Sequence, residues 1–226
     1  MSASPEMAAI WLTLKLAGLS MLILMLLGAP LAWWLSRTNW RGKVVLEAII
    51  ALPLVLPPTV LGFYLLLALG PGGFIGGALE ALGAHHLAFS FTGLVIGSVF
   101  YSLPFAVQPL QGAFQAIGAR PLEAAATMGA GPLDRFFTVA LPLARRGVIT
   151  AASLSFAHTL GEFGVVLMIG GNIPGKTQTL SILIYDQTEA MRFGAAHMLS
   201  AGLLGFAFVL LLGIYALNRR FPVGLK

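Results

Sequence analysis

The sequence contains no cysteine, which excludes disulfide bonds and thiolate metal sites. It also has little charge, because Asp, Glu, Lys and Arg make up only 9% of its 226 residues while 58% are hydrophobic. A soluble domain carries about 25% charged residues, so this chain cannot cover a water-facing surface. Its net charge of +5 includes no basic cluster interleaved with aromatic residues, which argues against nucleic-acid binding. These shortages predict an all-α polytopic membrane protein.

Five apolar runs are long enough to cross a membrane, which takes roughly 20 residues per helix. They cover residues 9–35, 44–69, 87–114, 147–169 and 195–217. The first run is too long for a signal peptide, and MSASPEM before it lacks a positive charge. Residues 70–86 and 172–194 are predicted as loops, the first with a short helix over 75–82 and the second with a partly inserted amphipathic helix. The whole chain, 1–226, is predicted to be one transmembrane domain.

Lysine and arginine are distributed unevenly between the connecting segments. Ten of the 13 lie after the first, third and fifth runs: Arg37, Arg41, Lys43, Arg120, Arg135, Arg145, Arg146, Arg219, Arg220 and Lys226. Only Lys176 and Arg192 fall in the opposite loops, and Lys15 lies inside the first run, from which it can reach the outer interface. The positive-inside rule then predicts an external N-terminus and a cytoplasmic C-terminus.

The stretch GGNIPGKT, Gly170 to Thr177, matches the nucleotide-binding P-loop pattern at every position. Its context argues against an ATP site, because it follows an apolar run of helix length on the predicted outer side. Asp186, which could serve as a magnesium partner, comes only nine residues after Thr177. That distance is too short for the helix and returning strand that a P-loop fold requires. A capped turn before a short helix is the alternative interpretation.

The cytoplasmic loop over residues 120–142 is the most informative segment. Pro121 suits the first position of a helix, and Gly129 is placed to end that helix in a left-handed conformation. A second short helix is predicted from Gly131 to about Val139, closed by Pro142. The loop has an apolar face that must pack partly on this chain, while the rest could enter a partner's groove or lie on lipid headgroups. That face comprises Leu122, Ala125, Met128, Phe136 and Phe137.

The spacing in this loop resembles the EAA loop of ABC importer permeases. Glu123-Ala124-Ala125 is followed after three residues by Gly129 and after nine more by Val139-x-Leu141-Pro142, with Val139 in place of isoleucine. The stretches 52–66 and 161–186 are similar to the molybdate permeases of the sulfate, tungstate and molybdate branch. The likeness covers nearly the whole chain.

The resemblance implies a type I ABC importer permease fold and a multi-pass subunit of the bacterial inner membrane. It implies a homodimer, two ATPase subunits that bind ATP and magnesium, and an external oxyanion-binding protein. This chain would then be no enzyme and would hold no cofactor or metal. Its cargo would be molybdate, with tungstate, sulfate or thiosulfate as alternatives, moved by alternating access. The implied coupling residues are Glu123, Ala124, Ala125, Gly129, Phe136, Leu141 and Pro142.

Polar residues of the fourth run are the candidates for a gate. His158 and Glu162 are four residues apart, so a continuous helix would place them on one face, and Ser155 and Thr159 on an adjacent stripe. A gate, a packed polar pair and a proton relay in an ion-coupled secondary transporter are the open interpretations. A non-transporting scaffold is a further class. Pro53, Pro57 and Pro58 are predicted to interrupt the second run, because a proline removes a backbone hydrogen bond and kinks a helix. Pro57 and Pro58 are therefore candidates for the path. The remaining candidates are Asn172, Lys176, Thr177 and Gln178 at the outer rim or a binding-protein contact.

Overall fold

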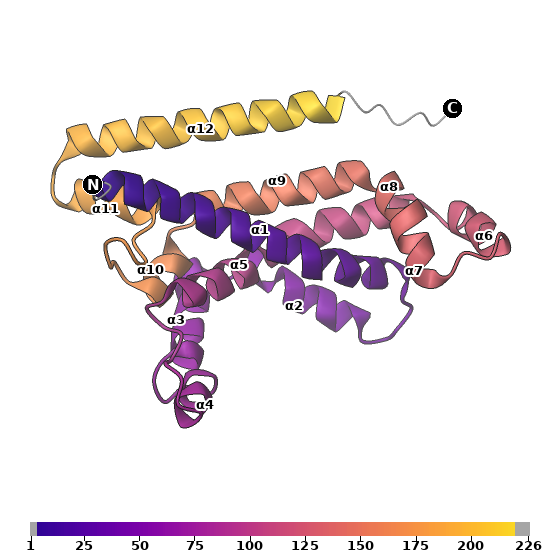
Figure 1. The fold of residues 1–226 in the computed structure, drawn as a ribbon, viewed down its shortest axis with the longest axis horizontal. Helices are drawn as coiled ribbons and strands as arrows, with labels where there is room; N and C mark the ends of the chain where they lie inside the picture. Colours follow the sequence, from indigo (N-terminus) through magenta and orange to yellow (C-terminus); the bar gives the residue numbers. More distant parts are fainter. Residues whose placement is uncertain (1–3, 220–226) are drawn as a thin grey trace.

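The computed structural model describes residues 4–219, and all regular structure among them is helical (Figure 1). These residues form twelve α-helices, of which α7 and α8 have only three residues each, and one π-helix. Their bounds are α1 Pro5–Arg37, α2 Lys43–Val55, α3 Pro58–Leu69, α4 Gly76–Ala81, α5 Phe91–Ala116, α6 Arg120–Thr127, α7 Pro132–Asp134, η1 Arg135–Ala140, α8 Leu141–Leu143, α9 Arg145–Gly161, α10 Gly164–Gly170, α11 Leu180–Glu189 and α12 Phe193–Arg219.

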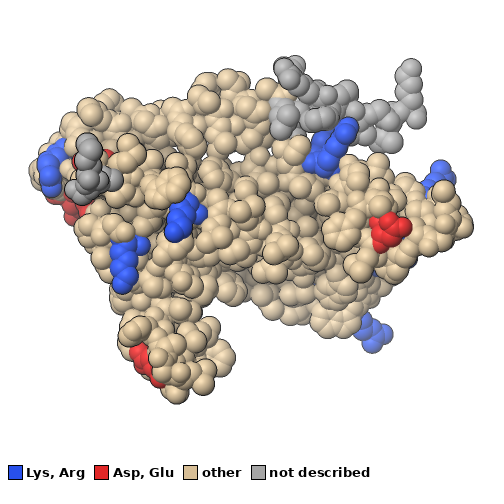
Figure 2. All heavy atoms as spheres, viewed as in Figure 1, with Lys and Arg blue, Asp and Glu red and all other residues tan. Residues whose placement is uncertain are grey.

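Helices α1, α5 and α9 form the bundle along the long axis of the molecule (Figure 1). The segments α6 to α8 lie at one end, and α10, α11 and the start of α1 lie at the other. Charged side chains on the face shown in Figure 2 gather toward these two ends. The basic residues Arg220 and Lys226 lie outside the described residues.

Small buried residues explain the close packing of α1 on its neighbours. Ala9, Ala17 and Ala32 are at most 2% exposed, and Gly28 lies where an added Cβ would be 3.6 Å from Val107. Small side chains let apolar helices approach closely, which is the main source of packing energy when lipid surrounds them. The opposite side of α1 carries exposed leucines and Trp11. This helix therefore has one protein-facing and one outward face.

Within the described part of the chain, the three helices α1, α5 and α12 are long and apolar enough to cross a membrane, and two bent pairs complete a set of up to five spans. The predicted number of five spans is confirmed if each bent pair is counted as one span. The predicted short helices appear as α4 and α11. The bend between α9 and α10 corrects the expectation that the fourth run forms a continuous helix.

The second span breaks between α2 and α3 with a bend of 113°. Pro57 and Pro58 both lack a backbone N–H, and a proline forces the residue before it into an extended conformation. Leu56 and Pro57 accordingly have ψ angles of 136° and 137°. The sequence predicted an interruption here, but the result is a change of direction that carries α3 and α4 sideways from the bundle (Figure 1).

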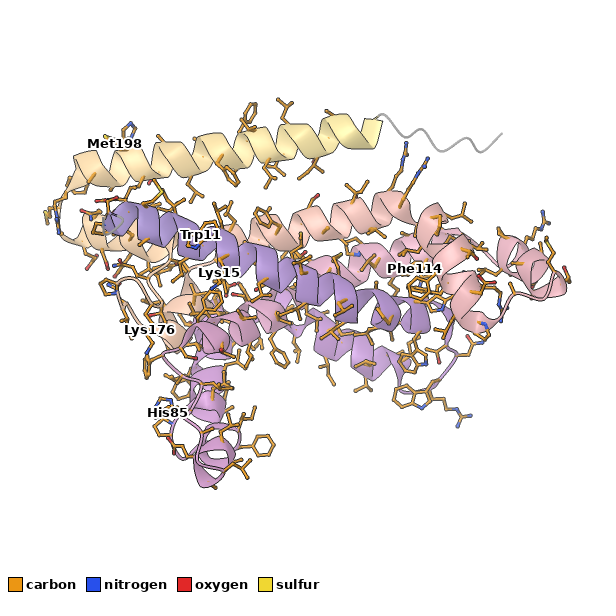
Figure 3. All side chains as sticks on the ribbon, in the orientation of Figure 1. Trp11, Lys15, His85, Phe114, Lys176 and Met198 are labelled. Atoms are coloured by element: carbon orange, nitrogen blue, oxygen red, sulfur yellow. The ribbon has the colours of Figure 1, made fainter. Side chains whose placement is uncertain are left out.

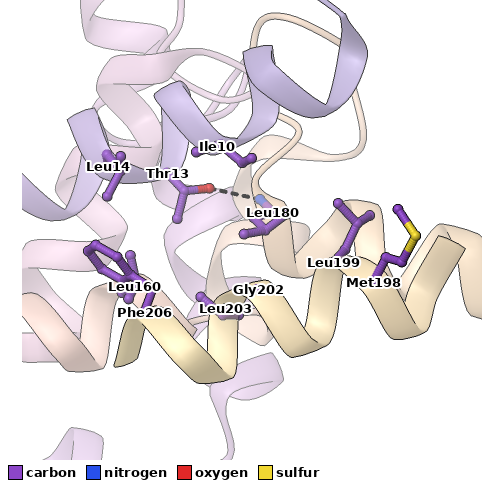
Figure 4. A pocket seen from close by; sticks show the side chains of 10 residues that line it. All are labelled: Ile10, Thr13, Leu14, Leu160, Leu180, Met198, Leu199, Gly202, Leu203 and Phe206. Atoms are coloured by element: carbon purple, nitrogen blue, oxygen red, sulfur yellow. Dashed lines mark hydrogen bonds between the residues drawn. The ribbon is translucent and has the colours of Figure 1, made fainter. Parts of the chain in front are cut away.

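The helix α12 makes only limited contact with its own chain. It runs beside α9 and α11 (Figure 1), and its most apolar stretch has no buried residue. An apolar crevice separates part of it from α1, lined among others by Leu14, Leu160 and Phe206 (Figure 4). Near this crevice the hydroxyl of Thr13 accepts a hydrogen bond from the Leu180 N–H at 2.8 Å, which fixes the start of α11 against α1. Most of α12 remains open to lipid or to another protein surface.

Candidate functional site

The loop over residues 120–142, which we call the coupling loop, bends at Gly129. Gly129 has φ +89°, and the N–H of Ala130 donates to the carbonyl of Ala125 at 3.0 Å, a bond typical of a helix end closed by a left-handed residue. An added Cβ at Gly129 would meet nothing within 4 Å. The backbone angle alone therefore favours glycine, and the predicted left-handed bend is confirmed.

The apolar face of the coupling loop is divided between the chain's own core and solvent. Phe136 is 7% exposed, and its ring centre lies 5.7 Å from that of Trp33 and 5.9 Å from that of Phe114. Phe114 lies at this end of α5 (Figure 3). Phe137 and Met128 are 60% and 88% exposed. The two adjacent phenylalanines thus differ in role, because Phe136 anchors the loop on α1 and α5 while Phe137 faces outward.

The second half of the coupling loop does not end at Pro142 as predicted. It passes through the π-helix η1 into α8, which contains Leu141 and Pro142. In this wider turn the Leu141 N–H donates to the Phe136 carbonyl five residues back. The wide turn lies where the missing N–H of Pro142 would interrupt an α-helix. Glu123 and Ala124 are exposed on α6, and Ala125 is half-buried.

The breaks in the two bent spans meet inside the molecule. The fourth span bends by 60° between α9 and α10, at Glu162 and Phe163. A Cβ added to Gly164 would lie 2.6 Å from the Cβ of Pro58, and one added to Gly62 would lie 2.7 Å from the Cβ of Met168. The starts of α3 and α10 are therefore in close contact. We call this place the junction. Broken helices that meet within the membrane are a recurring way to build transport sites.

A chain of hydrogen bonds joins α9 to α5 beside the junction. The Ser102 hydroxyl lies 2.9 Å from His158 Nδ1 and 2.9 Å from the Thr159 hydroxyl. The His158 ring stacks on Phe105 at 4.0 Å between centres and lies 4.8 Å from Tyr101. Ser102 and Thr159 are buried, so these bonds satisfy polar groups that have no access to water. The cluster holds the last turn of α9 against α5.

Glu162 does not share a helical face with His158, which corrects the predicted pairing. The helix α9 ends at Gly161, and Glu162 is extended, with ψ 135°. Its side chain is 5% exposed, and neither carboxyl oxygen has a hydrogen-bond partner among the described residues. The hydroxyl of Ser98 is likewise buried without such a partner. Glu162 therefore lies at the break itself, in the linker between α9 and α10.

An open cavity of about 630 Å³ lies at the junction. Its lining includes Pro58, Tyr101, His158, Glu162 and Met168, so three predicted path residues meet there. Ser155 and Pro57 are not among the lining residues, and Ser155 instead donates to the Ala151 carbonyl of its own helix at 2.8 Å. Ser102 and Tyr101 were not identified from the sequence. Both lie in a mostly apolar helix, and the sequence pattern does not show that they face α9.

The stretch GGNIPGKT forms a tight turn after α10, and an α-helix precedes it where a P-loop fold has a strand. Thr177 is fully buried, donates to the Gly170 carbonyl at 2.7 Å and accepts from the Ile173 N–H at 3.2 Å. Gln178 donates to the side chains of Asn172 and Asp186, at 2.7 and 3.0 Å. Asn172 also donates to Asp186 at 2.6 Å. Asn172 and Thr177 of the motif, together with the following Gln178, are thus used in closing the loop onto α11.

Bent spans meeting at a polar junction, with a helical loop projecting at one end, define the class of a multi-pass membrane transport subunit. The family of binding-protein-dependent transport system inner membrane components matches residues 12–221. The chain belongs to this family of permeases.

Relatives of known role resemble the chain over most of its length. The molybdenum transport system permease protein ModB of Azotobacter vinelandii is 60% identical over 98% of this chain and 97% of its own. ModB of Escherichia coli K12 is 39% identical over 86% of each chain. The sulfate transport system permease protein CysT of Salmonella typhimurium is 34% identical over 86% of this chain and 70% of its own.

Solved structures show the same fold at low sequence identity. A chain of a bacterial ABC transporter that imports the acidic polysaccharide alginate matches 97% of this chain and 81% of its own length, with TM-score 0.81 and 18% identity. The inward-facing MetNI methionine ABC transporter matches 97% of this chain and 99% of that one, with TM-score 0.70 and 17% identity. The fold is therefore that of type I ABC importer permeases, as the sequence predicted.

Proposed function

We propose that this chain is the membrane-spanning subunit of an ATP-driven importer of molybdate. The single observation that carries the proposal is the 60% identity to a molybdenum permease across nearly the whole of both chains. The aligned region therefore includes the coupling loop, the junction and the outer loops. ATP hydrolysis is assigned to a separate subunit, and this chain is a non-catalytic conduit.

The coupling loop is the proposed contact with the ATPase. Its outward residues include Met128, Leu133 and Phe137, which are 88%, 75% and 60% exposed. An amphipathic helix pair of this kind suits a groove on a partner protein. Because Phe136 is packed against Trp33 and Phe114, a displacement of the docked loop would be transmitted to α1 and α5. This rigid attachment supports mechanical coupling between nucleotide state and the spans.

The junction is the proposed gate. A movement of α9 relative to α5 would have to break the hydrogen bonds of Ser102 to His158 and Thr159, or move the Ser102 side chain together with α9. The same movement would change the contact of Gly164 with Pro58, and so the direction of α3. Two bent spans that share one contact can switch together between two arrangements, which alternating access requires. A hydrogen-bonded His158 that stacks on Phe105 and does not pair with Glu162 gives no support to a proton relay.

A homodimer is proposed because large apolar faces remain open on one chain. On α2 and α3 these include Val45, Val55, Phe63 and Tyr64, which are 62%, 83%, 46% and 64% exposed. A symmetric pair could place the two junctions near one axis and enclose a common path. The coupling loop would face the cytoplasm, and the N-terminal end and the loop from Asn172 to Gln178 would lie at the outer rim, on the side from which an external binding protein delivers the solute. The proposed location is a bacterial inner membrane, in keeping with the family of inner membrane components that matches the chain.

Reconstitution in proteoliposomes with the cognate ATPase and binding protein tests the function. ATP-dependent uptake should be greatest for molybdate when molybdate, tungstate and sulfate are compared at equal concentration. The relation to a sulfate permease makes sulfate the second candidate. Uptake that continued without the ATPase and collapsed with the proton gradient would assign the chain to secondary transport instead.

A further inference from the structure

Two lysines meet in one groove at the end of the molecule opposite the coupling loop. The groove, of about 560 Å³, is lined by Lys15 of α1, by Lys176 of the loop before α11, and by an apolar floor that includes Trp11 and Phe91. The labels of Trp11, Lys15 and Lys176 mark this region in Figure 3. Among residues 4–219, none of those that line the groove is acidic. The site therefore offers two positive charges above an apolar surface.

Neither amine is neutralised within the part of the chain that the structure describes. Lys15 Nζ lies 4.7 Å from the centre of the Phe91 ring, a cation–π contact, and neither lysine forms an ion pair with a described carboxylate. In Figure 2 the face over α1 and α10 shows basic atoms with no acidic atoms between them. An anion supplied from outside the chain would neutralise the two amines.

The lysines lie beside the first turn of α5, where this candidate span begins. The helix α5 begins at Phe91, and its N-cap is Ser90, so the Phe91 ring marks the end of that span. Lys15 contacts this ring, and Lys176 belongs to the turn at the same end. The nearby Trp11 is 68% exposed, as expected of an aromatic residue at a membrane interface. The phosphate groups of lipids are concentrated at this level.

The outward face of α1 continues below Lys15 as an apolar stripe. Leu19, Leu22 and Leu26 follow at intervals of three or four residues and are 38%, 60% and 74% exposed. An ion such as free phosphate or molybdate would gain nothing from this stripe or from the apolar floor of the groove. A phospholipid would gain from both, because its headgroup would contact the amines while an acyl chain followed the leucines.

We propose that the groove of Lys15 and Lys176 is a binding site for the headgroup of an anionic phospholipid. The site is separate from the junction and from the coupling loop, and it does not depend on which solute the transporter moves. Each amine contributes attraction of the size known for a basic residue near an anionic surface, which corresponds to about fivefold in affinity. The lipid would fix α1 at a defined depth against α5.

Native mass spectrometry of the purified full chain, with its ATPase subunit where the two copurify, can measure binding of phosphatidylglycerol and phosphatidylcholine. We expect Lys15→Gln and Lys176→Gln each to weaken phosphatidylglycerol binding about fivefold, and the double variant about 25-fold. Phosphatidylcholine binding should not change. Arg192→Gln is the matched control, because Arg192 is an exposed cation at the same end that does not line the groove.

Several results would overturn the proposal. One is unchanged phosphatidylglycerol binding in a double variant that still binds phosphatidylcholine normally. Another is an equal loss in Arg192→Gln, which would indicate a diffuse surface charge. Displacement of the lipid by millimolar inorganic phosphate or molybdate would assign the groove to a free oxyanion. A change of oligomeric state in the double variant, with lipid binding intact, would assign it to a second copy of the chain.

Discussion

Gly164→Ala tests whether the contact between the two broken spans controls transport. The new Cβ would lie 2.6 Å from the Cβ of Pro58, whereas carbon atoms in good contact are about 3.5–4.0 Å apart. Both atoms are fixed to the backbone, so no rotation of a side chain can relieve the overlap of about an ångström. Overpacking of this kind costs about 1–3 kcal/mol. The energy would be relieved by moving α3 away from α10, which changes the proposed gate.

The matched control is Gly161→Ala, at the same bend between α9 and α10, where an added Cβ meets nothing within 4 Å. Uptake of molybdate and ATP hydrolysis should be measured together in proteoliposomes, at equal amounts of inserted protein. If the arrangement in which α3 contacts α10 is destabilised by about 1–3 kcal/mol, its population falls about 5–150-fold. We expect a loss of uptake within that range for Gly164→Ala and little change for Gly161→Ala. Equal uptake by the two variants would refute the assignment of the gate to the junction.

Four further substitutions separate the roles of individual residues. Ser102→Ala leaves His158 and Thr159 without their shared partner, and should lower stability by about 1–3 kcal/mol, seen as a lower melting temperature in detergent; an unchanged temperature would contradict the bonding pattern. Phe136→Ala should destabilise the chain by about 3–5 kcal/mol, whereas Phe137→Ala should leave the melting temperature near that of wild type and weaken ATPase copurification; the reverse result would mean that the two rings have been assigned wrongly. Lys176→Ala should leave ATP hydrolysis by the ATPase subunit unchanged, because Lys176 belongs to an outer turn, and complete loss of ATP hydrolysis would restore the nucleotide-site interpretation.

The coupling loop could be predicted from the sequence because its signals are local. Proline at the start of a helix and glycine at its end each act through their own backbone, so the bend at Gly129 follows from the residue type. The division between Phe136 and Phe137 could not be predicted in the same way. It depends on Trp33 and Phe114, which are distant in sequence, and on the π-helical turn that rotates one ring inward.

The junction was predicted only in part for a related reason. Pro57 and Pro58 indicated an interruption, but a bend of 113° depends on how α3 packs against α10. The pairing of His158 with Glu162 assumed a continuous helix, and the helix ends between them at Gly161. Glycines on both sides of Glu162-Phe163 were a local sign of the break, since glycine weakens a helix and permits close backbone contact. The partner Ser102 lies on another span and carried no such sign.

The central claim is that ATP drives this permease through the coupling loop, and the most direct measurement compares Gly129→Asp with Gly131→Ala in reconstituted uptake. Gly129 has φ +89°, where a side chain costs about 1–2 kcal/mol, and aspartate adds a charge to the docking face. Gly131 has φ −70° and free space for a Cβ, so alanine there is a control in the same loop. The account predicts that Gly129→Asp inserts normally but loses ATP-driven molybdate uptake or ATPase binding, while Gly131→Ala keeps both. Normal ATP-driven uptake by Gly129→Asp would contradict it.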